Sequence, residues 1–249
     1  MQRSGIRFAY NEPAMVMRAG GEDYLVIGDL HIGIERELSK RGVHVFSATE
    51  FMANRIKKIM KQFSLKKIIM LGDIKETILY PDTSGSLQIK GFFDQLGRFD
   101  VTIIAGNHDA HLGDIIDTPI KRELILGRFA LLHGDKNPSD NAMMCDYIVT
   151  AHSHPIVRIK DTNGAIYDEK VWLMAALNKT AARKAYDNVN SGIRLIVMPA
   201  FNSLIMGTSL GRFYSESANP LIRNRIFLPR KAEIYNLAGQ RIDLRSVIG

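Results

Sequence analysis

Five short apolar runs, each ending at or just before polar side chains suited to binding metals, constrain the fold of this chain more than any other feature. The runs occupy residues 24–28, 66–71, 100–105, 128–133 and 146–151. Each has the length of a strand and mostly lacks strict alternation, which indicates strands buried on both faces of a sheet. Open α/β sheets bind ligands at the carboxyl ends of their strands, so the polar residues found there are the first candidates for a site.

The segments around these runs predict the rest of an α/β fold. Residues 48–63 repeat apolar side chains at helical spacing, which predicts a crossover helix, and a second helix is expected at residues 86–96. Beyond residue 155 the pattern changes to strand-like pieces separated by long polar connections, which predicts a second, mixed or antiparallel sheet. These pieces are residues 169–174, 192–198 and 231–237.

Size and composition favour one globular domain. Of the 249 residues, 46% are hydrophobic and 24% are charged, so we expect a single domain over residues 1–249. The net charge of +7 favours acidic partners such as phosphate backbones, although a basic proteome background explains the same charge equally well.

Cysteine usage and hydropathy favour a cytoplasmic protein. Cys145 is the single cysteine, so it has no partner for an internal disulfide. The first residues lack the apolar core of a signal peptide, and no apolar run approaches the roughly 20 residues of a membrane helix. We therefore expect a reducing cytoplasm and no membrane anchor.

The side chains at the strand ends form a mixed set of metal ligands. Carboxylate, imidazole and amide oxygen together suit divalent ions such as Mn²⁺, Fe²⁺, Zn²⁺ or Ni²⁺, and the lack of thiolates argues against a structural zinc site. In an extended stretch residues i and i+2 point the same way, so both members of D-x-H and of H-x-H are expected to face one site. The candidates are Asp29, His31, Asp73, Asn107, His133, His152 and His154.

The order of these blocks, D-x-H, GD, GNHD, H and H-x-H, resembles the signature of the calcineurin-like metallophosphoesterase superfamily. The blocks span residues 29–154. Within that superfamily the chain looks most similar to the small archaeal and bacterial phosphoesterases related to SbcD-type repair nucleases, partly through PAFNSLIMG at residues 199–207. The resemblance implies a four-layer α/β/β/α sandwich with two mixed sheets.

The resemblance also implies two divalent metal ions, with Mn²⁺ favoured and Fe, Zn or Ni as alternatives. Water activated by these ions would attack the phosphate in line, without a covalent enzyme intermediate. Position by position, it assigns Asp29, His31 and His154 to the first ion, Asn107, His133 and His152 to the second, and Asp73 as the bridge between them.

Two further residues of the GNHD block are candidates for catalysis. The resemblance assigns His108 to the phosphate or to the leaving oxygen, as a proton donor. Asp109 either orients that imidazole or only forms a turn, and the sequence favours neither alternative. The lone histidines His44 and His111 are not expected to take part, and Cys145 is expected to be a buried filler.

The chain departs from the repair nucleases at Glu76, where they carry a histidine. A carboxylate there either repels a phosphodiester or holds a basic neighbour such as Lys75. Basic residues further along the chain are candidates for contacts with a polyanion, against the alternative that they only keep the protein in solution. They are Lys179, Arg183, Lys184, Arg223, Arg225, Arg230 and Lys231.

These observations predict a phosphoesterase whose favoured substrate is a phosphodiester in DNA or RNA. A small-molecule phosphodiesterase or a phosphomonoesterase is the alternative within enzymes, because the metal blocks are shared while pocket walls decide the substrate. A non-catalytic scaffold is a further alternative, although such proteins tend to lose ligands that this chain retains. The resemblance also raises an ATPase as a protein partner, without showing one.

Overall fold

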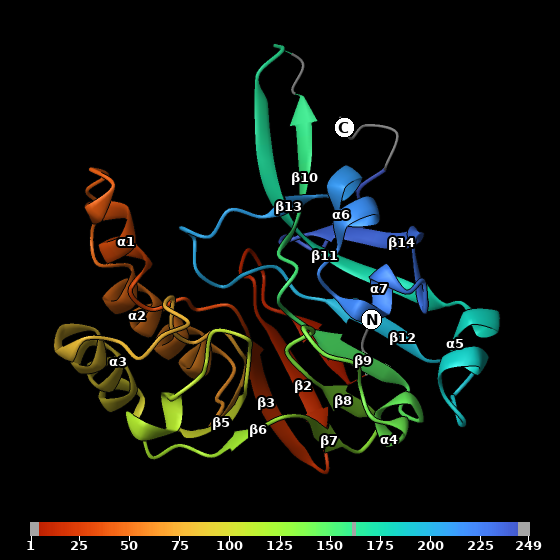
Figure 1. Cartoon of the computed structure of the whole chain (residues 1–249), viewed down its shortest axis with the longest axis horizontal. Coiled ribbons are helices and arrows are strands. Elements are labelled where there is room, and N and C mark those ends of the chain that lie inside the picture. Colours follow the sequence, from red (N-terminus) through yellow and green to blue (C-terminus); the bar gives the residue numbers. More distant parts are fainter. Residues whose placement is uncertain (1–4, 161–162, 244–249) are drawn as a thin grey trace.

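The computed structural model describes residues 5–160 and 163–243, and two β-sheets packed face to face form its centre (Figure 1). The first sheet has the strand order β1-β2-β3-β4-β5-β6. Strands β1 to β3 pair antiparallel, whereas β3 to β6 are parallel. The strands are β1 (Ile6–Phe8), β2 (Met15–Ala19), β3 (Glu22–Ile27), β4 (Lys67–Leu71), β5 (Asp100–Ile104) and β6 (Ile120–Lys121).

The second sheet is also mixed. Its strand order is β13-β10-β11-β12-β9-β8-β7, and β14 pairs with the long strand β11. Within it β8, β9 and β12 are parallel neighbours. The strands are β7 (Leu124–Leu126), β8 (Phe129–Leu131), β9 (Tyr147–Thr150), β10 (Pro155–Lys160), β11 (Ile166–Leu177), β12 (Arg194–Val197), β13 (Thr208–Ser209) and β14 (Phe227–Asn236).

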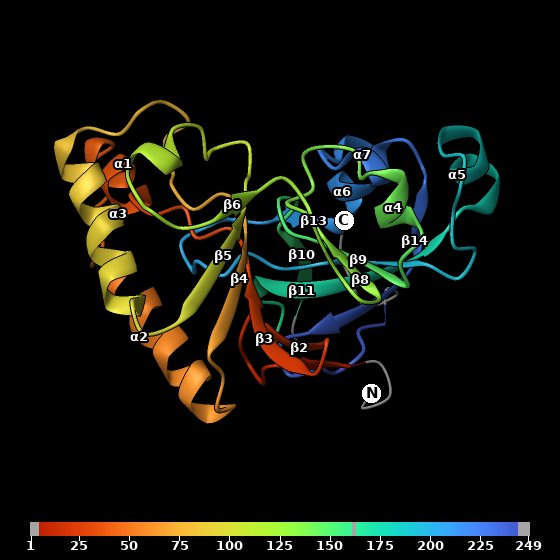
Figure 2. The ribbon, with the colours of Figure 1, turned by 90° about the horizontal axis from the view of Figure 1, so that it is seen from below.

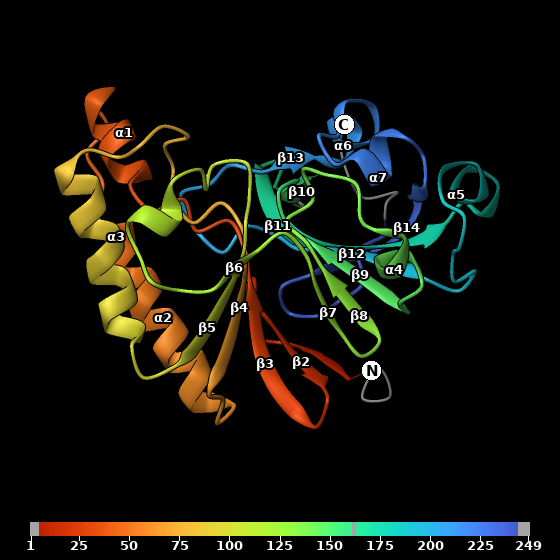
Figure 3. The same cartoon turned by 60° about the horizontal axis from the view of Figure 1, so that its bottom comes forward.

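Helices lie outside both sheets, so the molecule has a helix layer, two sheets and a second helix layer (Figures 2 and 3). The first sheet is flanked by α1 (Ile34–Lys40), α2 (Ala48–Gln62) and α3 (Thr83–Leu96). The second is flanked by α4 (Asp140–Met143), α5 (Lys179–Ala185), α6 (Leu210–Glu216) and α7 (Pro220–Arg223). This arrangement confirms the α/β/β/α sandwich, including the helices expected near residues 48–63 and 86–96.

Three apolar cores separate the four layers, which explains why the strands lack strict alternation. In β4, Ile68 and Met70 pack under α2 and α3, while Ile69 and Leu71 point into the core between the sheets. Strand β9 divides its side chains in the same way. A strand covered on both faces has no polar face to show in the sequence.

The second sheet begins earlier than the sequence pattern predicts. The expected boundary near residue 155 is wrong, because β7, β8 and β9 already belong to the second sheet. The runs at 128–133 and 146–151 resemble those of the first sheet because β8 and β9 are likewise parallel and buried on both faces. The apolar pattern of a strand reflects how many of its faces are buried. Because strands of both sheets are buried on both faces, the pattern does not show where one sheet ends and the other begins.

None of the helices in the described residues combines the length and the apolar character that crossing a bilayer requires. An apolar core fills the space between each pair of adjacent layers. The single domain expected over residues 1–249 stays a prediction.

The core between the sheets depends on Trp172, which is fully buried and stacks on Phe8 at 4.3 Å between ring centroids. Trp172→Ala should lower the free energy of unfolding by about 3–5 kcal/mol, because it removes a buried aromatic side chain and leaves a cavity. Urea denaturation followed by circular dichroism measures the change. The matched control is Phe46→Ala, at a fully exposed position, which should change stability by less than about 0.5 kcal/mol.

Candidate metal centre

The loops after β3, β4 and β9 place their ligands through left-handed backbone turns. Five of the seven candidate ligands have positive φ angles: Asp29 (58°), His31 (45°), Asp73 (49°), His152 (67°) and His154 (42°). Aspartate and histidine tolerate this region better than most residues, but each such residue still carries strain. The extended geometry expected for D-x-H and H-x-H is therefore wrong.

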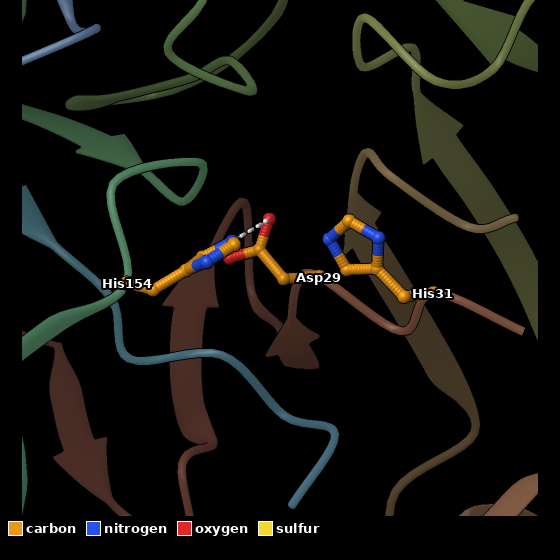
Figure 4. Close-up of side chains that lie close together, drawn as sticks. All are labelled: Asp29, His31 and His154. Atoms are coloured by element: carbon orange, nitrogen blue, oxygen red, sulfur yellow. Dashed lines mark ion pairs between the residues drawn. The ribbon is translucent and has the colours of Figure 1, made fainter. Parts of the chain in front are cut away.

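Asp29, His31 and His154 form the first group of ligand atoms, which all lie within 4.8 Å of one another. Figure 4 shows the Asp29 carboxylate between the two imidazoles. His154 Nε2 is 3.2 Å from Asp29 Oδ1. The Nε2 atoms of both histidines are buried and have no hydrogen-bond partner in the described structure. Buried nitrogens without partners, facing a carboxylate, fit a divalent cation.

Asp73, His133 and His152 form the second group. His133 Nε2 lies 3.0 Å from His152 Nδ1 and 3.2 Å from Asn107 Oδ1. Amide oxygen therefore joins imidazole and carboxylate here, as the sequence predicts. His152 and His154 lie in different groups, which is the division between two ions that the resemblance implies.

The Asp73 carboxylate lies between the two groups. Its Oδ2 atom is 3.7 Å from His31 Nε2 and 3.3 Å from His133 Nε2. Its Oδ1 atom accepts a hydrogen bond of 3.0 Å from the His108 backbone amide. A Cβ atom on Gly106 would lie 2.3 Å from Asp73 Oδ1, so only glycine fits at that position. These contacts give one carboxylate access to both groups.

Hydrogen bonds fix which imidazole nitrogens are available. His133 Nδ1 is 2.8 Å from the Leu71 carbonyl, which only accepts, so Nδ1 carries the hydrogen and leaves the Nε2 lone pair for a metal. His31 has the same arrangement, with Nδ1 2.8 Å from Glu76 Oε2. In His108, Nδ1 faces the Glu76 carbonyl, so its Nε2 atom is the one left for proton exchange.

The ionisable side chains of the centre shift one another's pKa values. Burial disfavours a charged His133, but hydrogen bonding to Asp73 and the charges of Asp29 and Asp73 raise its pKa to about 9. Burial and the neighbouring His133 lower the pKa of His152 to about 4. Burial alone would raise the pKa of Asp29, yet the adjacent His154, His133 and His31 lower it. Without a cation, the charges of Asp29 and Asp73 thus favour the protonated form of His133.

Glu76 has a role that was not among the alternatives drawn from the sequence. Its carboxylate receives the His31 Nδ1 hydrogen bond, and its pKa is lowered chiefly by that bond. The alternative that Glu76 holds Lys75 is wrong, because the buried Lys75 ammonium donates to the carbonyls of Thr77, Ile78 and Leu79. A carboxylate behind a metal-ligating histidine orients the ring and raises its basicity.

Asp109 fastens two loops to each other. Its Oδ1 accepts 2.7 Å from the Ile74 amide and its Oδ2 accepts 2.8 Å from the Gly106 amide. Both oxygens thus bind backbone, which favours the turn-forming role over the orientation of the His108 ring. The loops that carry Asp73 and Asn107 are held together by this carboxylate.

A segment from the second half of the chain supports the first ligand loop. Buried Asn202 donates 2.7 Å to the Leu30 carbonyl, and its backbone amide donates to the Asp29 carbonyl. Lys170 Nζ in turn holds the carbonyls of Ala200 and Asn202, at 2.7 and 2.6 Å. Within PAFNSLIMG, Asn202 is thus a support of the D-x-H turn, which no signal in a single sequence reveals.

The remaining sequence candidates lie outside the two groups. His44 and His111 are exposed, and Cys145 is buried, as expected of a filler. Lys179, Arg183 and Lys184 are exposed on α5, which lies at the far end of the second sheet in Figures 1 and 2. Arg223, Arg225, Arg230 and Lys231 are also exposed.

We predict that Glu76→Gln lowers metal affinity about 10–100-fold, because the amide cannot support the His31 ring as a carboxylate does. Isothermal titration calorimetry with Mn²⁺ measures the loss, which does not require turnover. Glu37→Gln is the matched control, since Glu37 pairs with Lys40 at 2.7 Å on the surface. Equal affinities of the two variants would contradict a role for Glu76 in holding His31.

A family model described as calcineurin-like phosphoesterase matches residues 23–164, which is more than half of the chain. The matched segment contains every candidate ligand. A search of curated proteins found no match.

Solved structures similar to the chain include a nuclease and a phosphoesterase. The crystal structure of the Pseudomonas putida nuclease MPE has a TM-score of 0.56 at 15% identity, covering 90% of this chain and 97% of that one. The phosphoesterase YfcE from E. coli has a TM-score of 0.34 at 17% identity, covering 55% of this chain and 73% of that one. At these identities the first match supports the fold alone.

Proposed function

The chain belongs to the calcineurin-like phosphoesterase family, and on that premise we propose that it hydrolyses phosphodiester bonds at a centre of two divalent ions. Nucleic acid is the favoured substrate, Mn²⁺ is the favoured ion, and Fe, Zn or Ni are the alternatives. The nuclease named among the similar structures is consistent with this substrate class.

One observation carries the proposal: Asp73 Oδ2 lies 3.7 Å from His31 Nε2 of the first group and 3.3 Å from His133 Nε2 of the second. An oxygen shared by two ligand groups favours two ions over one. Bound there, a pair of ions would lower the pKa of water and neutralise the phosphate oxygens. We assign Asp29, His31 and His154 to one ion, and Asn107, His133 and His152 to the other.

The chain's own residues supply proton transfer and positioning. We assign His108 Nε2 to the leaving oxygen, because Nδ1 is committed to the Glu76 carbonyl and holds the ring in place. Glu76 sets the His31 ring, and Asp109 fixes the loops of Asp73 and Asn107. Asp109 is therefore proposed as a positioning residue and not as an acid or base.

The experiment that tests the proposal is hydrolysis of bis-p-nitrophenyl phosphate by chelator-stripped protein with Mn²⁺ added back. The wild type should turn over in a metal-dependent manner. Asp73→Asn should lose most of that turnover, because a neutral amide is a poor bridging ligand for two cations. If the protein hydrolyses no bis-p-nitrophenyl phosphate with any divalent ion but releases phosphate from p-nitrophenyl phosphate, a monoesterase would be favoured instead.

His108→Ala should keep both ions and lose about 10²–10⁴-fold in kcat, the usual contribution of a well-placed proton donor. Metal content by elemental analysis and kcat on the same diester separate the two effects. Loss of metal in this variant would mean that His108 is a ligand, in a group with His31 and Glu76 whose ligand atoms also lie within 4.8 Å of one another.

A further inference from the structure

A cleft of about 290 Å³ opens beside the second ligand group and shares His133 with it. Three basic side chains line this cleft, Lys121, Arg122 and Lys136, and all three are exposed. None of them was a candidate from the sequence. The cleft lies where the edge strand of the first sheet meets β8 of the second.

The fold explains why these charges gather there. Lys121 ends β6, pairs with Ile104 of β5 and accepts 2.8 Å from the Ala105 amide, only two residues before Asn107. Lys136 follows His133 in the loop after β8. Both loops leave the carboxyl ends of parallel strands, the same edges that carry the metal ligands.

Two of the three basic groups are uncommitted. Among the residues that the structure describes, neither Lys121 nor Arg122 forms an ion pair, and Lys136 pairs with Asp135 at 3.6 Å. Two carboxylates also line the cleft: Asp135, which pairs with Lys136, and Glu123, which accepts from the Ser139 hydroxyl and amide at 2.6 and 3.0 Å. Free cations next to a hydrolytic centre are available to a second anionic group of the substrate.

A second cleft, of about 250 Å³, lies near Glu76 on the other side of the centre. Its basic groups are already engaged. Arg36 binds Asp82 with contacts of 2.6 and 2.8 Å, and Lys40 binds Glu37 at 2.7 Å. Lys75 is buried and donates to backbone carbonyls, and Glu76 also lines the cleft. The charges of this cleft are therefore compensated internally. The two sides of the centre differ in their attraction for phosphate.

We propose that the Lys121–Arg122–Lys136 cleft binds the phosphate next to the scissile one in a nucleic acid strand. This inference rests on the proposed phosphodiesterase function and names its substrate class more closely. The substrate is a strand with at least two consecutive phosphates, so an oligonucleotide is preferred over an isolated diester. The contact is with the backbone and is therefore independent of base sequence.

The test compares a single-stranded 12-mer of DNA with bis-p-nitrophenyl phosphate, which has one phosphate. The double variant Lys121→Gln/Arg122→Gln should lower kcat/KM on the 12-mer about tenfold and leave the chromogenic diester unchanged. The dependence of log(kcat/KM) on log[salt] should become shallower by about 0.7, the value for one phosphate contact on a single strand. The matched control, Arg183→Gln/Lys184→Gln on α5, removes the same charge away from the centre.

Each outcome separates the cleft from the proposed function. Equal losses of kcat/KM in the cleft variant and in the α5 control, or equal losses on both substrates, would overturn the proposed phosphate contact in the cleft. Fluorescence anisotropy of the labelled 12-mer with metal-loaded His108→Ala protein reads binding without relying on turnover. Weaker binding after the Lys121 and Arg122 substitutions would support phosphate binding in the cleft even if the protein hydrolyses no diester. Unchanged binding, together with normal hydrolysis of the chromogenic diester, would refute phosphate binding in the cleft and leave the proposed function intact.

Discussion

The Asp73 carboxylate has to reach two groups of ligands at once, and much of the surrounding architecture follows from that requirement. Its Oδ2 lies near His31 on one side and His133 on the other, so the loops of two sheets must come within a few ångströms of one oxygen. Gly106 permits this approach, because any side chain there would collide with the carboxylate. Left-handed turns at Asp29, Asp73 and His152 then direct the ligands inward.

Strain of this kind persists only when neighbouring groups hold it, at a typical cost of 1–3 kcal/mol for each residue. The chain supplies that support through buried polar contacts to the backbone. Asp109 joins the loops after β4 and β5, and Asn202 holds the turn between Asp29 and His31. The supporting residues are thus as necessary to the geometry as the ligands are, although they have no ligand role themselves.

Much of the fold could be predicted because burial and periodicity are local. Strands at 24–28 and 66–71 and the helix near 48–63 follow from apolar pattern alone. The change of sheet before β7 could not be predicted, since strands of both sheets are buried on both faces. The candidate ligands share one edge as expected, but their turns are left-handed because close packing around Asp73, and not strand geometry, sets them.

Partners distant in sequence are the other part that pattern cannot show. Asn202 and Leu30 are 172 positions apart, and the carboxylate of Glu76 meets a ring 45 positions away. Such pairs are set by how the sheets pack. Local sequence can show that Glu76 is unusual, but not that it faces His31.

The support of Leu30 by Asn202 also has a consequence for how the protein reaches its native state. Contacts of such long range close large loops of chain and usually form late in folding. The ligand turn at Asp29 has this support only in chains in which residues 30 and 202 have already been brought together. Ions that bind only the native centre would add about 2.7 kcal/mol to the free energy of unfolding at 100 times their dissociation constant, and would raise the melting temperature accordingly.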